Sequence, residues 1–199
     1  IIYDNHRFIG DVGWRQNQQT FDAFSFVSTG LADTTLSFAH VTNVNRIFSE
    51  KNTTLGDVKM RGELLNVAYR GIKAGALVGY GYLLDYAPGQ SLATTASNKT
   101  LGLRFDGGTA IDSNKLLYTA EYAQQSAYKD GASTVDANYL YGMLGMDITG
   151  IQFKFHYEVL SGDGVYALQT PLATLHAHNG WADKFLTTAT DGLTDRFIT

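Results

Sequence analysis

Cysteine is absent from the chain, and so are long apolar runs. Without cysteine there are no disulfides, no thiolate metal sites and no cysteine nucleophile. No segment approaches the roughly 18 to 20 apolar residues that a membrane-spanning helix needs. A helical membrane protein is therefore excluded, whereas a protein that crosses a membrane with β-strands is not.

Charged residues are also sparse, at 17% of the 199 residues, and the net charge of −4 is mild. This charge gives no basic patch of the kind that binds nucleic acid, so we predict no nucleic-acid partner. Aromatic residues make up 13% and are almost all tyrosine and phenylalanine. Few charges and many aromatics are unusual for the surface of a soluble single-domain monomer.

The segment 151–158 shows the clearest alternation, because successive side chains of a strand point to opposite faces. Its apolar face is formed by Ile151, Phe153, Phe155 and Tyr157, and its polar face by Gln152, Lys154, His156 and Glu158. Two interpretations are open. The segment is a half-buried strand of a soluble sandwich, or a membrane-barrel strand with aromatics facing lipid and polar groups lining a wet lumen.

The connections between the predicted strands decide between these two folds. Alternation predicts strands at about 21–29, 35–45, 63–70, 73–85, 99–106, 116–125, 137–147 and 151–160, and a strand again near 196–199. Short connections (30–34, near 71, 107–113, 148–150) alternate with long ones (46–62, 86–98, 127–136, 161–195). A Greek-key sandwich has no reason to alternate in this way, whereas an outer-membrane barrel has short periplasmic turns and long extracellular loops. We predict an all-β fold, an antiparallel up-and-down transmembrane β-barrel.

The same alternation predicts the domain organisation. Residues 1–199 belong to one outer-membrane barrel domain, in which 1–20 and 161–195 are long extracellular loops. Both ends then lie at the long-loop rim, although such barrels normally begin and end on the periplasmic side. We therefore expect about eight strands of a larger barrel.

The two faces of the predicted strands give the candidate site residues. We predict that the pore is lined by Arg70, Arg104, Asp106, Glu121, Lys154, His156 and Glu158. We predict that lipid is contacted by Leu101, Leu103, Phe105, Phe153, Phe155 and Tyr157. Acidic and basic residues are nearly balanced among the pore-lining set, so a strong ion preference is not expected from this part of the barrel.

Two further features each have two interpretations. Gly75, Gly79 and Gly81 share one face of the 73–85 strand, where they leave room for inward-folded loops or mark a bend in the sheet. Arg7, Arg15 and His6, in the loop before the first strand, contact an anionic ligand or the pore wall, or the arginines are solvated and paired locally.

Three segments carry a resemblance to a known family: Asp4 to Gly10, Gly13 to Ala23, and Gly180 to Phe185 followed by Asp191-Gly192. They closely resemble the alginate-export-type family of proteobacterial outer-membrane barrels, and the first two resemble its uncharacterised porin-like members. The resemblance implies a barrel about twice as long and passive passage of a solute. The dedicated exporter has an arginine-rich constriction, from which this sequence departs, so alginate is not the expected solute.

Other function classes have weaker support. Glu121 with Glu158 has the residue types of a general acid and base, and His156 with Ser161 those of a base and nucleophile, but neither pair lies in a supporting motif. His176 and His178 have metal-ligand spacing without a third ligand nearby. A soluble ligand-binding barrel would need its aromatic faces inward and Arg104, Lys154 and Glu158 outside.

We therefore predict a non-enzymatic porin or channel of the bacterial outer membrane that passes small or anionic solutes passively. Its partners are outer-membrane lipid and small solutes, and it needs no cofactor and no metal. The alternatives are an outer-membrane barrel enzyme and a soluble ligand-binding β-barrel. The oligomeric state is not predicted.

Overall fold

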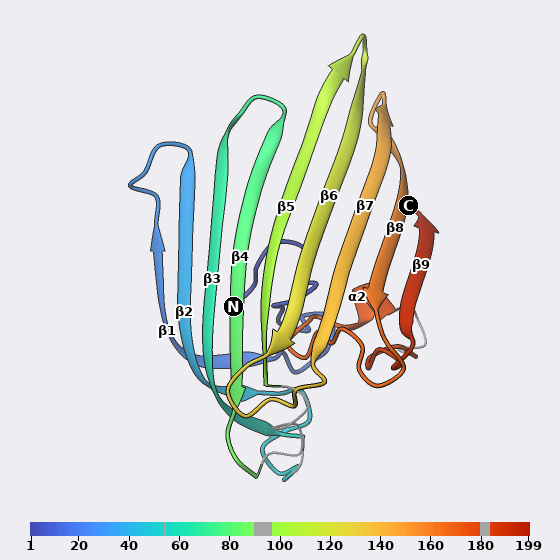
Figure 1. Cartoon of the computed structure of the whole chain (residues 1–199). Coiled ribbons are helices and arrows are strands. Elements are labelled where there is room, and N and C mark those ends of the chain that lie inside the picture. Colours follow the sequence, from blue (N-terminus) through green and yellow to red (C-terminus); the bar gives the residue numbers. More distant parts are fainter. Residues whose placement is uncertain (54, 90–96, 180–183) are drawn as a thin grey trace.

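The structure is a computed structural model that describes residues 1–53, 55–89, 97–179 and 184–199. Within these ranges it is one antiparallel sheet in which each strand pairs with the next along the chain (Figure 1). The strands are β1 (Thr20–Ser28), β2 (Thr34–Asn45), β3 (Asp57–Ile72), β4 (Gly75–Tyr86), β5 (Asn98–Ile111), β6 (Asn114–Ala127), β7 (Asp136–Ile148), β8 (Ile151–Ser161) and β9 (Gly192–Ile198), with a short helix α2 (His176–Asn179) before β9.

The predicted fold class, an all-β up-and-down antiparallel arrangement, is confirmed. Short turns at 29–33, 73–74, 112–113 and 149–150 alternate with longer connections at 46–56, 87–97, 128–135 and 162–191. In Figure 1 the short turns lie at the top, and the strand ends that lead into the longer connections lie at the bottom. In the described part of the chain, no helix is long and apolar enough to span a membrane.

Several strands are longer than predicted. β3 begins at Asp57 rather than at Glu63, because buried Val58 and Met60 continue the alternation with charged Lys59 and Arg61. The charged residues on one face are the reason why residues 57–62 were predicted to belong to a loop. β5 likewise continues to Ile111, so the predicted turn at 107–113 shrinks to 112–113, and the last strand begins at Gly192 rather than Arg196.

The turn between β7 and β8 shows how local conformation fixes the hairpins. Thr149 and Gly150 both have positive φ angles, 51° and 93°. Two consecutive residues of this kind make the turn whose twist matches that of the flanking strands. The Gly150 amide also donates to the Asp147 carboxylate at 3.0 Å, which closes the turn. The register of β7 and β8 then pairs Ile148 with Ile151.

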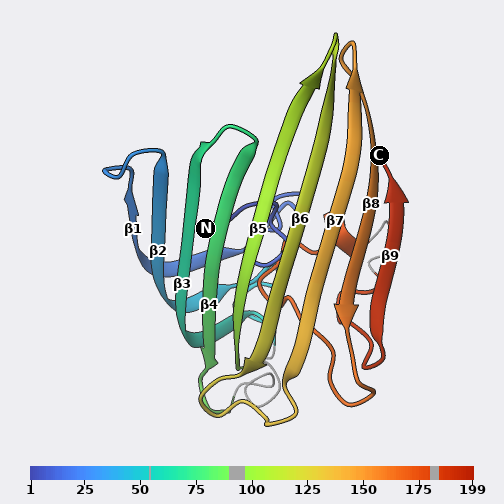
Figure 2. The ribbon, with the colours of Figure 1, turned by 45° about the horizontal axis from the view of Figure 1, so that its top comes forward.

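The sheet is curved, and its concave side faces the N-terminal segment (Figure 2). On β4 the buried residues Tyr80, Tyr82 and Leu84 lie on the concave side with Phe8. The idea that Gly79 and Gly81 leave room for inward-folded loops is therefore wrong, since they lie on the opposite face, next to the side chains of Leu103 and Leu101. One glycine that makes room inside is Gly102, whose added Cβ would collide with the ring of Tyr80.

The convex face is apolar across the sheet. Large apolar side chains are exposed there on strand after strand, among them Phe24, Phe26, Leu65, Leu101, Leu103, Tyr122, Leu140, Leu144, Phe153 and Phe155. Exposed apolar surface on this scale marks contact with a membrane or another protein. β1 and β9 end the sheet, and among the described residues neither pairs along its outer edge with a further strand.

Candidate functional site: the concave face of the sheet

Two chain segments fold onto the concave face, and we call them the inner layer: residues 1–19 before β1 and residues 162–175 after β8. They meet at a parallel bridge between Ile9 and Leu172, where the Gly10 amide donates to the Leu172 carbonyl at 2.8 Å. The Gln19 side chain, buried at 3% exposure, donates to the carbonyls of Gly10 and Leu172 at 3.0 and 3.3 Å. The inner layer is thus held together by the backbone as well as by packing.

Phe8 anchors the inner layer in the wall of the sheet. Its ring centroid lies 5.5 Å from that of Tyr80, 6.2 Å from that of Tyr82 and, edge to face, 5.2 Å from that of Tyr139. Such aromatic pairs contribute about 0.5 to 1.5 kcal/mol beyond the area that they bury. Phe8 therefore fixes the position of its neighbour Arg7 relative to β7 and β8.

Arg7 forms an ion pair across the inner layer and the wall. Its Nε and Nη2 donate to the two oxygens of Glu158 on β8 at 2.9 and 3.1 Å, and the Tyr139 hydroxyl on β7 donates to the same carboxylate at 2.6 Å. The side chains of Arg7 and Glu158 are 1% and 5% exposed. Of the two interpretations of Arg7, contact with the wall is the one observed.

A second cluster lies around Arg104 on β5. Its Nη1 donates to Glu121 on β6 at 2.7 Å, and its Nε and Nη2 both donate to Asp106, the latter at 2.7 Å. The Tyr80 hydroxyl donates to Glu121 at 2.7 Å, and the Thr119 hydroxyl donates to Asp106 at 2.8 Å. Every charge in this cluster therefore has a partner of the opposite sign.

The two clusters account for most of the predicted pore-lining residues. Arg104, Asp106 and Glu121 lie together, and Glu158 lies with Arg7, which the sequence did not place in the pore-lining set. Together the clusters hold two guanidinium groups and three carboxylates. In the two pairs that are buried on both sides, Arg7 with Glu158 and Arg104 with Glu121, attraction offsets the loss of hydration.

The other predicted pore-lining residues lie nearer the short turns. His156 is 8% exposed, and its two ring nitrogens contact the Tyr141 and Thr199 hydroxyls at 2.7 and 2.9 Å, while its ring stacks on Phe197 at 4.3 Å. Lys154 is half-buried on the same face. Arg70, at the end of β3, is exposed and donates to the Thr35 hydroxyl at 3.2 Å. Lining of a pore by these residues stays a prediction.

The residues predicted to contact lipid share the convex face. Leu101, Leu103, Phe153 and Phe155 are 51% to 58% exposed. Phe105 and Tyr157 are half-buried in the same alternation, since Phe105 stacks on Tyr118 at 6.1 Å and Arg196 lies over the Tyr157 ring at 5.4 Å. Their contact with lipid stays a prediction.

The structure does not bring together the two catalytic pairs that the sequence suggested, Glu121 with Glu158 and His156 with Ser161. Glu121 is paired with Arg104 and Glu158 with Arg7, so neither carboxylate is free to serve as a general acid. His156 contacts Tyr141 and Thr199, whereas the Ser161 hydroxyl accepts from the Asn138 amide at 2.7 Å. The pairing of His156 with Ser161 is therefore wrong.

The two histidines of α2 also have other roles than metal binding. The His176 ring packs on Trp14 at 4.3 Å, and the His178 Nε2 lies 3.0 Å from the Asn5 carbonyl. Among the described residues no group of three His, Asp or Glu side chains has the arrangement of a metal site. Burial, together with the positive charge of Arg7, lowers the pKa of His178 to about 4. His178 therefore acts as a neutral hydrogen-bond donor that ties α2 to the N-terminal segment.

Part of the third segment that resembles the alginate-export-type family lies outside the described residues, namely Gly180 to Asp183, including Trp181. The segments Asp4 to Gly10 and Gly13 to Ala23 are described, and they form most of the N-terminal part of the inner layer and the start of β1. The motif residues therefore contribute the contacts of Phe8 and Arg7 with the wall.

The sequence matches no protein-family model and no curated protein. The fold is similar to that of solved Pseudomonas aeruginosa proteins. OpdQ has a TM-score of 0.65 at 18% identity, over 84% of this chain and 46% of that chain. OccK11 (OpdR) has a TM-score of 0.62 at 17% identity, over 81% and 43%. The outer membrane protein OpdK has a TM-score of 0.60 at 15% identity, over 83% and 42%.

The chain spans less than half the length of these solved structures. Their similarity confirms a porin-like barrel fold, and the narrower resemblance to alginate-export-type barrels stays a prediction. The chain has the fold of nine consecutive strands of a larger porin-like β-barrel, with an inner layer that covers the charged side of its wall.

Proposed function

We propose that the chain is part of a channel in the bacterial outer membrane through which small solutes pass passively. The observation that supports this most is the division of one curved sheet into two faces. The convex face exposes apolar side chains on strand after strand, and the concave face carries the charged clusters. Transmembrane barrels divide their faces in this way, with lipid outside and a polar interior.

The solute class follows from the charges of the concave face. Arg7, Arg104, Arg70 and Lys154 supply four positive charges there, and Asp4, Asp106, Glu121 and Glu158 supply four negative ones. This balance favours weak ion selectivity over the strong anion preference that a polyuronate exporter requires. OpdK has been solved with vanillate, a small aromatic carboxylate. We extend the proposal to small carboxylates of this size and not to alginate.

Planar-bilayer recording of the full-length protein tests the proposal. Stepwise increases in current at constant voltage are expected as single barrels insert. Lys154→Gln removes one positive charge from a half-buried concave position, so the reversal potential in a salt gradient should shift towards cations. The shift should shrink as salt rises, because the screening length falls to about 3 Å at 1 M. A protein that inserts without conducting would contradict the channel.

Lys99→Gln is the matched control, because Lys99 lies on the convex face. It removes the same charge outside the lumen and should leave the reversal potential unchanged. Equal shifts in both variants would show that the measurement reports overall charge rather than the conducting path.

A further inference from the structure

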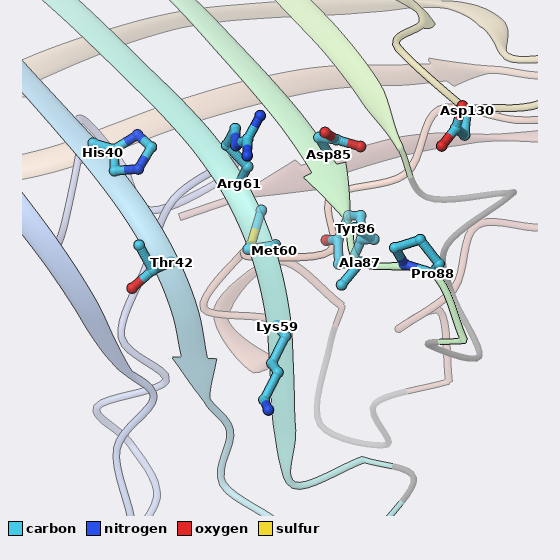
Figure 3. Close-up of a pocket in the computed structure, with 10 residues that line it drawn as sticks. All are labelled: His40, Thr42, Lys59, Met60, Arg61, Asp85, Tyr86, Ala87, Pro88 and Asp130. Carbon is cyan, nitrogen blue, oxygen red and sulfur yellow. The ribbon is translucent and has the colours of Figure 1, made fainter.

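A groove of about 410 Å³ opens on the convex face at the end of the sheet that carries the long connections. Figure 3 shows it across β2, β3 and β4, with the inner layer behind the strands. Its charged lining consists of His40, Lys59, Arg61, Asp85 and Asp130. The proposed channel uses none of these residues, because they lie on the other side of the wall.

The charges of this groove are not neutralised internally. His40 is paired with Glu63 at 2.8 Å. In the part of the chain that the structure describes, the side chains of Lys59, Arg61, Asp85 and Asp130 form no hydrogen bond or ion pair. Arg61 and Asp85 are direct partners in the register of β3 and β4, yet they do not pair. Two cations and two carboxylates are thus available to one ligand.

The groove lies just beyond the apolar band of the convex face. Phe26, Phe38 and Leu65 form one row across β1, β2 and β3, because the register pairs Phe26 with Phe38 and Phe38 with Leu65. Arg61 is four residues farther along β3 than Leu65, which at about 3.3 Å per residue is about 13 Å. A lipid whose chains lie on the apolar row would therefore place its headgroup at Arg61.

We propose that this groove binds an outer-leaflet lipid whose headgroup is a phosphorylated sugar. Lys59 and Arg61 supply charge-assisted donors for the phosphate. Asp85 and Asp130 accept hydrogen bonds from sugar hydroxyls, whereas a headgroup of phosphate alone would meet their repulsion. The inference rests on the proposed outer-membrane location, with the long connections on the outer side.

Native mass spectrometry of the full-length protein in detergent tests the site, with lipid A as the probe. A complex with one lipid A is expected for the unaltered protein. Lys59→Gln with Arg61→Gln should lower the bound fraction about tenfold or more, since it removes both charge-assisted donors for the phosphate. Lys73→Gln with Lys115→Gln removes two exposed positive charges at the short-turn end of the sheet and should leave binding unchanged. Equal loss in both double variants would overturn the site.

Two further lipids separate the headgroup chemistries. Lipid A without its phosphates should bind about as weakly as lipid A does to the Lys59→Gln, Arg61→Gln variant. Phosphatidylglycerol, which has a phosphate but no sugar, should bind less than lipid A, and equal binding would overturn the assignment to a phosphorylated sugar. An oligomer that falls apart in the Lys59→Gln, Arg61→Gln variant would show instead that a second copy of the chain covers the groove, which also overturns it.

Conductance of the same preparations distinguishes failure of the lipid site from failure of the channel. A conducting protein that binds lipid A no better than its Lys59→Gln, Arg61→Gln variant contradicts the lipid site alone. A protein that binds lipid A at these residues without conducting supports the lipid site and contradicts the channel alone.

Discussion

Arg7 and Glu158 are the two ends of a buried ion pair between the inner layer and β8, with side-chain exposures of 1% and 5%. Removing one partner of such a pair leaves a buried charge without compensation and costs about 3 to 5 kcal/mol. We expect Arg7→Met to lower the unfolding free energy by an amount of this order. Urea titration of the refolded protein in lipid vesicles, followed by tryptophan fluorescence, measures it.

The double variant Arg7→Met, Glu158→Leu is the control for this prediction. It replaces both charges by apolar side chains, which is often neutral or stabilising, so it should recover most of the loss. If the double variant is as unstable as Arg7→Met alone, the lost unfolding free energy comes from the packing of the aliphatic part of Arg7. It does not then come from the unpaired, buried carboxylate of Glu158.

Phe155 tests the outer face at the same scale. It is 51% exposed on the convex side of β8, where lipid is expected. Phe155→Arg should therefore cost roughly 2 to 4 kcal/mol of folding free energy in a bilayer if the residue lies near the midplane. Gln152→Arg introduces the same charge on the opposite face of the same strand and should cost much less. Equal costs in vesicles would place Phe155 away from lipid.

The sequence predicted on which face of the sheet an individual side chain lies. It did not predict which other side chain that residue contacts. Period-two alternation was enough to put Leu101 and Arg104 on opposite sides of β5. The pairing of Arg7 with Glu158 joins residues 151 positions apart, and no local pattern carries that information. The inward facing of Tyr80 and Tyr82 was missed because an aromatic strand face suits lipid as well as it suits the ring of Phe8.

Among the structural elements, α2 should respond to pH through His178. An undocked histidine has a pKa of about 6.5, and burial with the positive charge of Arg7 lowers the pKa of docked His178 to about 4. Undocked His178 therefore takes up a proton first, and docking is strongest above about pH 6.5 and weakens down to about pH 4. The protection factors of the amides in residues 1–10 and 176–178, taken relative to the intrinsic exchange rate at each pH, should fall over this range.

His178→Gln separates this effect from other titrations. Its side-chain amide can still donate to the Asn5 carbonyl that His178 contacts at 3.0 Å, but it does not titrate. The protection factors in this variant should vary much less between pH 6.5 and pH 4. An unchanged pH profile would assign the response to groups other than His178.

The strands were predicted better in number and order than in length. The alternation of apolar and polar residues predicted the positions of β1 to β8. The alternation of short and long connections predicted their antiparallel order. The first part of β3 was not predicted as strand, because Lys59 and Arg61 lie there on the convex face, beyond the apolar band. Where a strand extends past the apolar band, its outward side chains become polar although its backbone still pairs with the neighbouring strands. Such residues therefore lack the alternation that predicts a strand.

For the whole molecule, the lengths of the connections predict which end of the sheet faces the cell exterior. The longer connections are expected outside and the short turns inside. Cysteine at Lys129, in the connection between β6 and β7, should react with an impermeant thiol label on intact cells. Cysteine at Ser113, in the turn between β5 and β6, should react only after lysis, and the absence of native cysteine keeps the background low. The opposite pattern would invert the orientation.

The bridge between Ile9 and Leu172 has a consequence for the order of folding. Its two residues lie on either side of all the strands from β1 to β8, so the bridge closes a very long loop unless the sheet has already brought its ends together. Loop-closure entropy opposes such distant contacts until nearer ones have formed. The sheet should therefore form first with its concave face uncovered, and the inner layer should pack onto that face as a late step. In the channel that we propose, this late step would narrow the lumen.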